Sequence, residues 1–354
     1  MHITNDYHRQ SEIAALLASL PKTELHVHLD GSVLPQTLRE LALEQSNPLP
    51  PLTDEELSAL MQADEQCGSL PQYLSKFSFV LPYLQTSEAL ERTAYELVMQ
   101  AASHNVQYIE ARFAPQLHTA QGLTAEAAVE AVLRGLKRGE KTFGTMARAI
   151  VICLRSHSEE LNIAAVHAAY AFYGKGVVAV DLAGDEAAFP PHQFRRLFAI
   201  VREHSMPITI HAGEAAGADN VREAITGLGA LRIGHGVRMK EDDEVIKLVK
   251  QSGVALEMCP ISNLQTRAVA DWGQYPIREY LAQGIAVTVN TDNMTVSDTS
   301  LVKEFEALIL HCGLTLAEVA VIVMNGAKAA FLEPERKAEL VNRFERALAE
   351  AGIS

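Results

Sequence analysis

Short apolar runs recur along the chain and are separated by segments long enough to hold a helix. Several runs are rich in β-branched residues and almost uninterrupted, which is typical of parallel strands that are buried on both faces. The sequence therefore predicts eight strands, at residues 25–29, 106–113, 147–154, 177–182, 208–211, 232–235, 254–258 and 285–290.

The segments between these strands carry the periodicity of amphipathic helices, most clearly at residues 125–142 and 191–204. Eight alternating strand and helix units predict the α/β class and, within it, a closed (β/α)8 TIM barrel with a parallel sheet. One barrel can take up all 354 residues. Because no Pro/Gly-rich linker divides the sequence, we expect residues 1–354 to form a single domain.

The connection between the first two predicted strands, residues 31–105, is far longer than an ordinary loop between a strand and a helix. It contains helix-like runs at 69–81 and 87–103. In a barrel, an insertion of about 32–105 would lie over the mouth of the site, where lids are found. We expect a helical lid; the alternative is a structural cap that takes no part in opening or closing.

Composition then narrows the functional classes. The 30 Lys and Arg residues stand against 44 Asp and Glu residues, a formal net charge of −14, which argues against non-specific nucleic-acid binding. Residues 1–7 are polar and do not predict a signal peptide, and no uncharged apolar stretch reaches the ~18 residues of a membrane helix. Cys67, Cys153, Cys259 and Cys312 form no CxxC pair and indicate reduced thiols. We therefore expect a cytoplasmic protein.

The first chemical motif is His26-Val27-His28, at the end of the first predicted strand. Residues two apart on a strand point to the same face, so both imidazoles would face into the barrel and could clamp a metal ion. Partly buried histidines are common, however, and this pair alone is also compatible with a structural role.

The second motif, His211-Ala212-Gly213-Glu214, follows the fifth predicted strand. The histidine can supply a third nitrogen ligand. A carboxyl group held in a closed apolar pocket has a raised pKa and can act as an acid near neutral pH. The alternative for Glu214 is a surface glutamate at the start of a loop.

His235 and Asp292 stand at two further strand ends. His235 lies between two glycines that leave room for a ligand, so it can bind a metal ion, handle a proton or be a core histidine. Asp292 can supply an oxygen ligand, although aspartate is also an ordinary turn residue. All of these motifs fall at the carboxyl ends of predicted strands, which form the active face of a TIM barrel. Together they predict a catalytic metal site with one position open for water.

The motifs resemble those of the adenosine deaminase family, in the family's order and at about its spacing, from about residue 21 to 331. The matching segments are His-Val-His-Leu-Asp-Gly-Ser at 26–32, Asp-Leu-Ala-Gly-Asp-Glu at 181–186, His-Ala-Gly-Glu at 211–214, Gly-His-Gly at 234–236 and Asn-Thr-Asp at 290–292. This resemblance implies a zinc-dependent hydrolysis of adenosine, and also of 2′-deoxyadenosine, to inosine and ammonia in purine salvage.

The resemblance also implies roles for individual residues. One Zn²⁺ per chain would be bound by His26, His28, His211 and Asp292. Glu214 would protonate the purine ring nitrogen N1. His235 would orient and stabilise the attacking hydroxide, and Asp292 would join it in moving charge and protons.

Substrate contacts are implied in the same way. The Gly184 backbone N–H would contact ring nitrogen N3, and Asp30 would contact the ribose, with His28 also counted among the substrate contacts. Tyr73 and Phe77, in the long insertion, resemble the family's apolar lid. The implied ligand is a small purine nucleoside, and the sequence does not point to particular protein partners.

One position departs from the family pattern. Many members carry Asp-Asp after the eighth strand, whereas this chain has Asp292-Asn293. The second acid in those members reaches ring nitrogen N7, which is a hydrogen-bond acceptor, and an amide NH₂ is already a donor. We therefore interpret Asn293 as a competent replacement.

Other classes fit the residues less well. Adenine deaminases tend to carry Glu where this chain has Asp30, and deaminases of methylated AMP tend towards Asn there and need cations for the phosphate.

Two-metal amidohydrolases commonly have a modified lysine at the end of the fourth strand, which here lacks a lysine. A non-catalytic binding protein would lack a ligand or the acid, yet each motif position is filled. The carboxylates of residues 181–186 either hydrogen-bond to metal ligands and orient them, or are ordinary charged side chains of a loop.

We expect Asn293→Asp to retain activity within about two orders of magnitude, the scale of one hydrogen bond to a charged group. Steady-state turnover of adenosine by the folded, zinc-loaded variant tests this. Complete loss of turnover would contradict the interpretation of Asn293.

Overall fold

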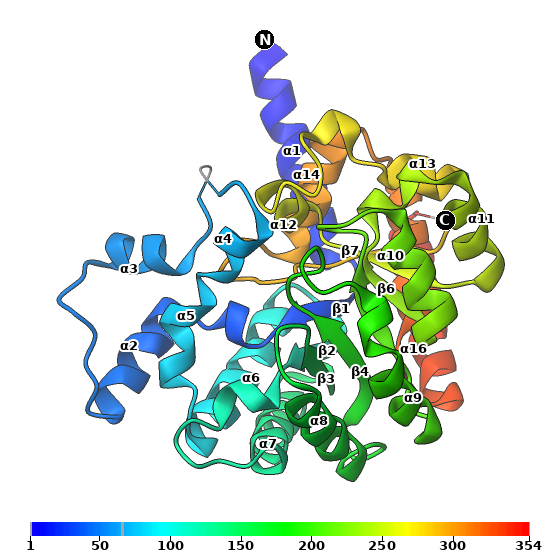
Figure 1. The fold of residues 1–354 in the computed structure, drawn as a ribbon. Coiled ribbons are helices and arrows are strands. Elements are labelled where there is room, and N and C mark those ends of the chain that lie inside the picture. Colours follow the sequence, from blue (N-terminus) through cyan, green and yellow to red (C-terminus); the bar gives the residue numbers. More distant parts are fainter. Residues whose placement is uncertain (1, 65–66, 354) are drawn as a thin grey trace.

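The computed structural model describes residues 2–64 and 67–353, and strands run through its centre (Figure 1). Within this part of the chain there are eight strands, paired in parallel. All eight predicted strands are present, with ends that differ from the prediction by a few residues. They are β1 (Lys22–His28), β2 (Val106–Phe113), β3 (Met146–Leu154), β4 (Val177–Ala183), β5 (Thr209–Ala212), β6 (Arg232–His235), β7 (Ala255–Met258) and β8 (Val287–Val289).

The strands pair in chain order as two four-stranded parallel sheets, β1-β2-β3-β4 and β5-β6-β7-β8. A single parallel bridge joins the sheets at each of two seams, Val180 to Ile208 between β4 and β5, and Val27 to Asp292 beyond the end of β8. At the second seam the His28 N–H donates to the Asp292 carbonyl (2.7 Å) and the Asp292 N–H donates to the His26 carbonyl (2.9 Å). The predicted (β/α)8 class is confirmed, with hydrogen bonding reduced to single bridges at the seams.

Helices surround the strands and also precede and follow them. They are α1 (His2–Ser19), α2 (Pro35–Glu44), α3 (Asp54–Met61), α4 (Leu70–Leu74), α5 (Phe77–Val80), α6 (Ser87–Ser103), α7 (Ala125–Phe143), α8 (Glu159–Ala171), α9 (Arg195–Glu203), α10 (Ala218–Glu223), α11 (Asp243–Ser252), α12 (Pro260–Gln265), α13 (Ile277–Ala282), α14 (Leu301–Cys312), α15 (Leu316–Ala329) and α16 (Pro334–Glu350). Within the described residues, no helix is both long and apolar enough to cross a membrane.

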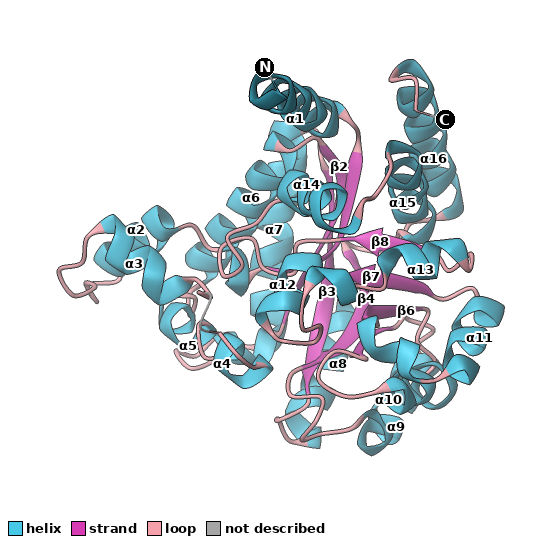
Figure 2. Cartoon of the chain, turned by 90° about the horizontal axis from the view of Figure 1, so that it is seen from above, coloured by secondary structure: helices cyan, strands magenta, loops and turns pink. Residues whose placement is uncertain are grey.

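The long connection after β1 is helical, as expected, and divides into two parts. The predicted helix at 87–103 is α6, which packs along α7 and against β2 as a helix of the barrel. The predicted run at 69–81 forms two short helices, α4 and α5. In Figure 2, seen from above, α2 to α5 project to one side of the strands. Their use as a lid stays a prediction.

The projecting part is attached to the loop that follows β8. The Ala63 N–H donates to the Val296 carbonyl (2.7 Å), and the Tyr73 hydroxyl lies 2.6 Å from Ser297 Oγ. Because that loop, which follows Val289, contains Asp292, the same segment carries a predicted metal ligand and the attachment of the insertion.

Helices α6 and α7 approach closely because α7 has glycines at the contact. A Cβ built on Gly135 would lie 2.1 Å from the Glu91 carbonyl oxygen, and one on Gly139 would lie 2.6 Å from Val98 Cβ. Gly135 is thus needed for the distance between the helices, although glycine weakens an isolated helix.

We expect Gly135→Ala to lower the free energy of unfolding by about 1–3 kcal/mol, because the new methyl group forces two backbones apart. Chemical denaturation measures the change. Lys137→Ala, which introduces the same residue on the exposed side of α7, is the control. Equal stability of the two variants would contradict this account of the helix contact.

Candidate active site

A cavity of about 320 Å³ opens at the carboxyl ends of the strands. The residues predicted to act on the substrate or the metal line it, except for His26, which lies buried beneath its floor. The lining includes His28, Asp30, Tyr73, Phe77, Gly184, His211, Glu214, His235, Asp292 and Asn293. Segments as distant in sequence as α4 and the loop after β8 therefore meet at one site.

Potential metal ligands cluster at the bottom of this cavity. One donor atom from each of His26, His211, His235 and Asp292 lies within 4.8 Å of the others. His28 joins them from the same strand as His26: its Nε2 lies 3.3 Å from Asp292 Oδ1 and 3.2 Å from His211 Nε2. Four imidazoles and one carboxylate are thus available as ligands for a metal ion.

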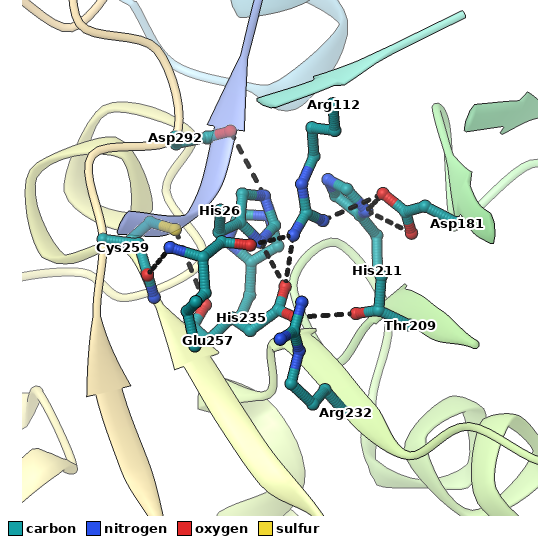
Figure 3. Close-up of polar contacts among 12 residues, drawn as sticks. His26, Arg112, Asp181, Thr209, His211, Arg232, His235, Glu257, Cys259 and Asp292 are labelled. Atoms are coloured by element: carbon teal, nitrogen blue, oxygen red, sulfur yellow. Dashed lines mark hydrogen bonds and ion pairs between the residues drawn. The ribbon is translucent and has the colours of Figure 1, made fainter. Parts of the chain in front are cut away.

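Carboxylates behind two of the histidines fix their orientation (Figure 3). His26 Nδ1 lies 2.8 Å from Glu257 Oε2, and His211 Nδ1 lies 3.0 Å from Asp181 Oδ2. A proton shared with the carboxylate on Nδ1 leaves the Nε2 lone pair directed at the cluster. His26 Nε2 is buried and makes no hydrogen bond in the described part of the chain; its ion-pair partner is Asp292 Oδ1, at 3.4 Å, so the donor set fits a cation between them.

Arginine side chains hold these two carboxylates in turn. Arg112 Nη1 lies 2.9 Å from Asp181 Oδ2, and its Nη2 lies 2.7 Å from Glu257 Oε2. Glu257 Oε1 accepts from Arg232 Nε (2.6 Å) and from Thr209 Oγ1 (2.9 Å). Burial alone raises the pKa of Glu257, but the charges of Arg112 and Arg232 outweigh it and hold that pKa well below its usual range.

From the sequence, it was left open whether Asp181 orients a metal ligand. The supporting roles of Glu257, Arg112 and Arg232 were not predicted. A signal was present, because Arg112 interrupts the buried apolar run of β2 and Glu257 that of β7. A charged residue in a strand buried on both faces needs partners inside the barrel. The pattern could not show which partners these are.

Asp292 is positioned by its backbone and by one side chain. Its φ of +59° lies in the left-handed region, which residues other than glycine adopt mainly where the surroundings impose it. Ser262 Oγ donates to Asp292 Oδ2 (2.6 Å), which leaves Oδ1 towards His26 and His28. The carboxylate is thereby directed at the cluster of histidines.

Glu214 meets the requirement for an acid. Burial raises the pKa of its carboxyl group well above the usual range, and the charges of Asp292 and Glu186 raise it further. Its Oε1 has no hydrogen-bond partner among the described residues, and its Oε2 lies 3.5 Å from His235 Nε2. A protonated carboxyl group in this position can donate into the cavity.

Burial and hydrogen bonding favour a neutral His235 ring with its proton on Nε2. Burial lowers its pKa well below the usual range. The Tyr275 hydroxyl donates to Asn263 Oδ1 (3.1 Å), which leaves the Asn263 amide to donate to His235 Nδ1 (2.9 Å). Because the remaining nitrogen, Nε2, then bears hydrogen, it offers no lone pair to a metal ion. His235 belongs to the group of clustered donors, and His28 approaches that group through Asp292 and His211, so the choice of His28 as a ligand stays a prediction.

Close backbone approach shapes the rest of the cavity. A Cβ on Gly31 would lie 1.7 Å from Asn293 Oδ1, and one on Gly234 would lie 2.8 Å from His26 Cε1. Gly184 has a φ of +106°, which exposes its backbone at the cavity wall. The Phe77 ring lies across from His28, with ring centroids 6.5 Å apart. The insertion therefore reaches the cluster of potential metal ligands.

Comparison with known proteins places this site in a family. A sequence model described as adenosine deaminase matches residues 21–347. The chain belongs to the adenosine deaminase family. An adenosine deaminase of Enterococcus faecalis is 45% identical over 328 residues, covering 93% of this chain and 97% of that protein.

Solved structures agree with this family assignment. An adenine deaminase from Arthrobacter aurescens superposes with a TM-score of 0.86 at 29% identity, covering 93% of this chain and 99% of that one. An amidohydrolase from Burkhoderia ambifaria, solved with bound Zn, also has a TM-score of 0.86, at 25% identity and with coverages of 96% and 94%. The family resemblance seen in the sequence is thus confirmed.

We expect Asp181→Asn to weaken binding of a divalent ion to this deaminase by about 10- to 100-fold, since an amide holds the His211 ring less well than a carboxylate. Titration of metal-free protein with Zn²⁺ against a competing chelator measures the affinity. Asp185→Asn, in the loop that follows β4, is the matched control because that carboxylate accepts from the backbone of Ala187 and Ala188. An unchanged affinity would contradict the role of Asp181.

Proposed function

We propose that this member of the family hydrolyses adenosine, and also 2′-deoxyadenosine, to inosine and ammonia. One observation carries the proposal: a buried carboxyl group with a raised pKa, Glu214, shares a cavity with a histidine and aspartate cluster that fits a metal ion. An acid beside an activated water is the combination that hydrolytic deamination of a purine requires.

The proposed cofactor is one Zn²⁺ per chain, bound by His26, His28, His211 and Asp292. Three imidazole nitrogens and one carboxylate oxygen suit zinc, and the amidohydrolase from Burkhoderia ambifaria was solved with bound Zn. A zinc ion held there would lower the pKa of a water molecule towards ~7, which makes a nucleophile available at neutral pH.

The side chains above the cluster carry out the proton transfers. Glu214 donates its proton to ring nitrogen N1, which draws electron density away from carbon C6 and favours addition of water there. The His235 Nε2–H orients the attacking oxygen and stabilises its charge. Asp292 takes part in moving the proton released by the water. That proton passes to the amino nitrogen, and the bond from C6 to this nitrogen breaks so that ammonia leaves. The proton remaining on the C6 oxygen returns to Glu214 as the C6 carbonyl forms.

The cavity wall would select the substrate. The Gly184 N–H faces N3, the Asn293 amide faces N7, and Asp30, with His28 beside it, accepts from the ribose. Tyr73 and Phe77 lie on the insertion, which would cover the bound nucleoside as a lid and exclude water. This assignment treats residues 1–354 as one barrel domain with a lid insertion at about 32–105.

A cytoplasmic location completes the proposal. The four cysteines, all within the described residues, are unpaired, and oxidising compartments favour disulfides. With a net charge of −14, the chain is suited to an uncharged nucleoside rather than to nucleic acid.

We expect purified, zinc-loaded protein to convert adenosine but not adenine, as followed by ultraviolet absorbance. Glu214→Gln should lower kcat by about 10²- to 10⁴-fold, because the amide cannot donate the same proton to N1. Glu203→Gln, at an exposed position of α9, should retain wild-type kcat.

Each other result has a distinct meaning. Conversion of adenine alone would keep the acid and the metal chemistry but overturn the ribose contact assigned to Asp30. Absence of turnover on both compounds, with one zinc bound per chain, would contradict the proposed substrate. Full activity of Glu214→Gln would contradict the acid.

A further inference from the structure

Glu186 is a buried carboxylate to which the proposed chemistry gives no role beyond helping to raise the pKa of Glu214. It lies in the loop after β4, and 1% of its surface is exposed. Its Oε1 accepts from the Gly213 N–H (2.7 Å) and from Asn220 Nδ2 (3.1 Å). Its Oε2 accepts from the N–H groups of Glu214 (3.0 Å), Ala215 (3.0 Å) and Ala216 (3.1 Å). Five donors thus converge on one carboxylate.

The four backbone donors are consecutive, from residue 213 to 216, in the loop between β5 and α10. Gly213 has a φ of +71°, which turns the chain so that successive N–H groups point to one side. Such a concave run of N–H groups binds an anion, and here the anion is a side chain of the same molecule. The loop is therefore wrapped around Glu186.

The carbonyl side of the same loop is held independently by Arg238. Its N–H donates to the Gly213 carbonyl (2.9 Å), and its Nη1 donates to the Ala215 carbonyl (2.9 Å). Residue 214 therefore lies between two fixed backbone neighbours. Its N–H is occupied by Glu186, so this peptide has little freedom to move.

The acid at residue 214 depends on this backbone anchoring. Its Oε2 lies 3.5 Å from His235 Nε2, and its Oε1 has no hydrogen-bond partner within the described residues. A side chain with so few contacts is placed mainly by the position of its own Cα. An error of about 1 Å in such a placement can cost on the order of 10² in rate.

We infer that Glu186 is the positioning residue for the catalytic acid: its carboxylate fixes the 213–216 backbone and thereby aims Glu214 at the purine. This inference rests on the proposed function for its effect on turnover. The anchoring of the loop can be tested without any substrate.

The main test is Glu186→Gln in the zinc-loaded enzyme. The amide has one acceptor oxygen, and its NH₂ would face backbone N–H groups, so part of the loop loses its anchor. We expect kcat to fall about 10- to 100-fold, with KM within about threefold of wild type and with one zinc per chain retained. Glu140→Gln is the matched control, because Glu140 also accepts a backbone N–H, that of Ala147, but lies at the opposite end of the barrel.

A double variant separates positioning from general damage. If Glu186 acts through Glu214, then adding Glu186→Gln to Glu214→Gln should lower the residual kcat by less than about threefold. A loss that is as large as in the wild-type background would overturn the inference, and so would a wild-type kcat for Glu186→Gln alone.

Hydrogen exchange provides the readout that does not depend on turnover. Amides of residues 213–216 should exchange at least about tenfold faster in Glu186→Gln than in Glu140→Gln, whereas unchanged exchange would overturn the anchoring. Wild-type protein that fails to deaminate adenosine, but whose loop loses protection in Glu186→Gln, would refute the proposed function alone. If Glu186→Gln does not fold, Asn220→Ala, which removes one of the five donors, should lower kcat about two- to fivefold; a wild-type kcat would then overturn the inference.

Discussion

The structure depends most on a single guanidinium group buried inside the barrel. Arg112 bridges Asp181 and Glu257, and these two carboxylates orient His211 and His26. Removing one partner from a buried ion pair typically costs about 3–5 kcal/mol, because the other charge is left unpaired away from water. The barrel interior therefore serves two needs at once. Its charges satisfy one another inside the fold, and by doing so they fix the direction of the histidine lone pairs that face the cavity.

Much of the fold was accessible from the sequence, because its main signals are local. The apolar runs that define β2 and β6 match their structural bounds, and α6 ends where its helical pattern ends. The His-x-His segment on β1 and the motifs at 211–214, 235 and 292 point to one site because parallel strands share a carboxyl edge. The ion pairs beneath the site were not accessible. Arg112 and Glu257 are 145 residues apart, and nothing in either segment specifies the other as its partner.

Loop conformation was a second limit on sequence reasoning. His235 and Asp292 have positive φ values. The sequence does not predict them, because a positive φ is expected mainly at glycine. The direction of the His235 proton depends on Asn263 and Tyr275, which lie outside the motif that contains His235. The five hydrogen bonds to Glu186 were likewise hidden behind an ordinary acidic residue. In each case the residue type was readable, but its role is set by contacts that only the assembled chain provides.

The weak seam between β8 and β1 has a consequence for the whole barrel. Val27, which forms the bridge to Asp292, lies between His26 and His28 in the chain, so donors from both half-sheets meet at a seam that has a single bridge, like the seam between β4 and β5. An ion bound by the β1 histidines of one sheet and by His211 and Asp292 of the other would link the two sheets across that seam. Binding of the ion and closure of the barrel would then be thermodynamically coupled. The stability of the contact between the two sheets would therefore rise with the concentration of free ion.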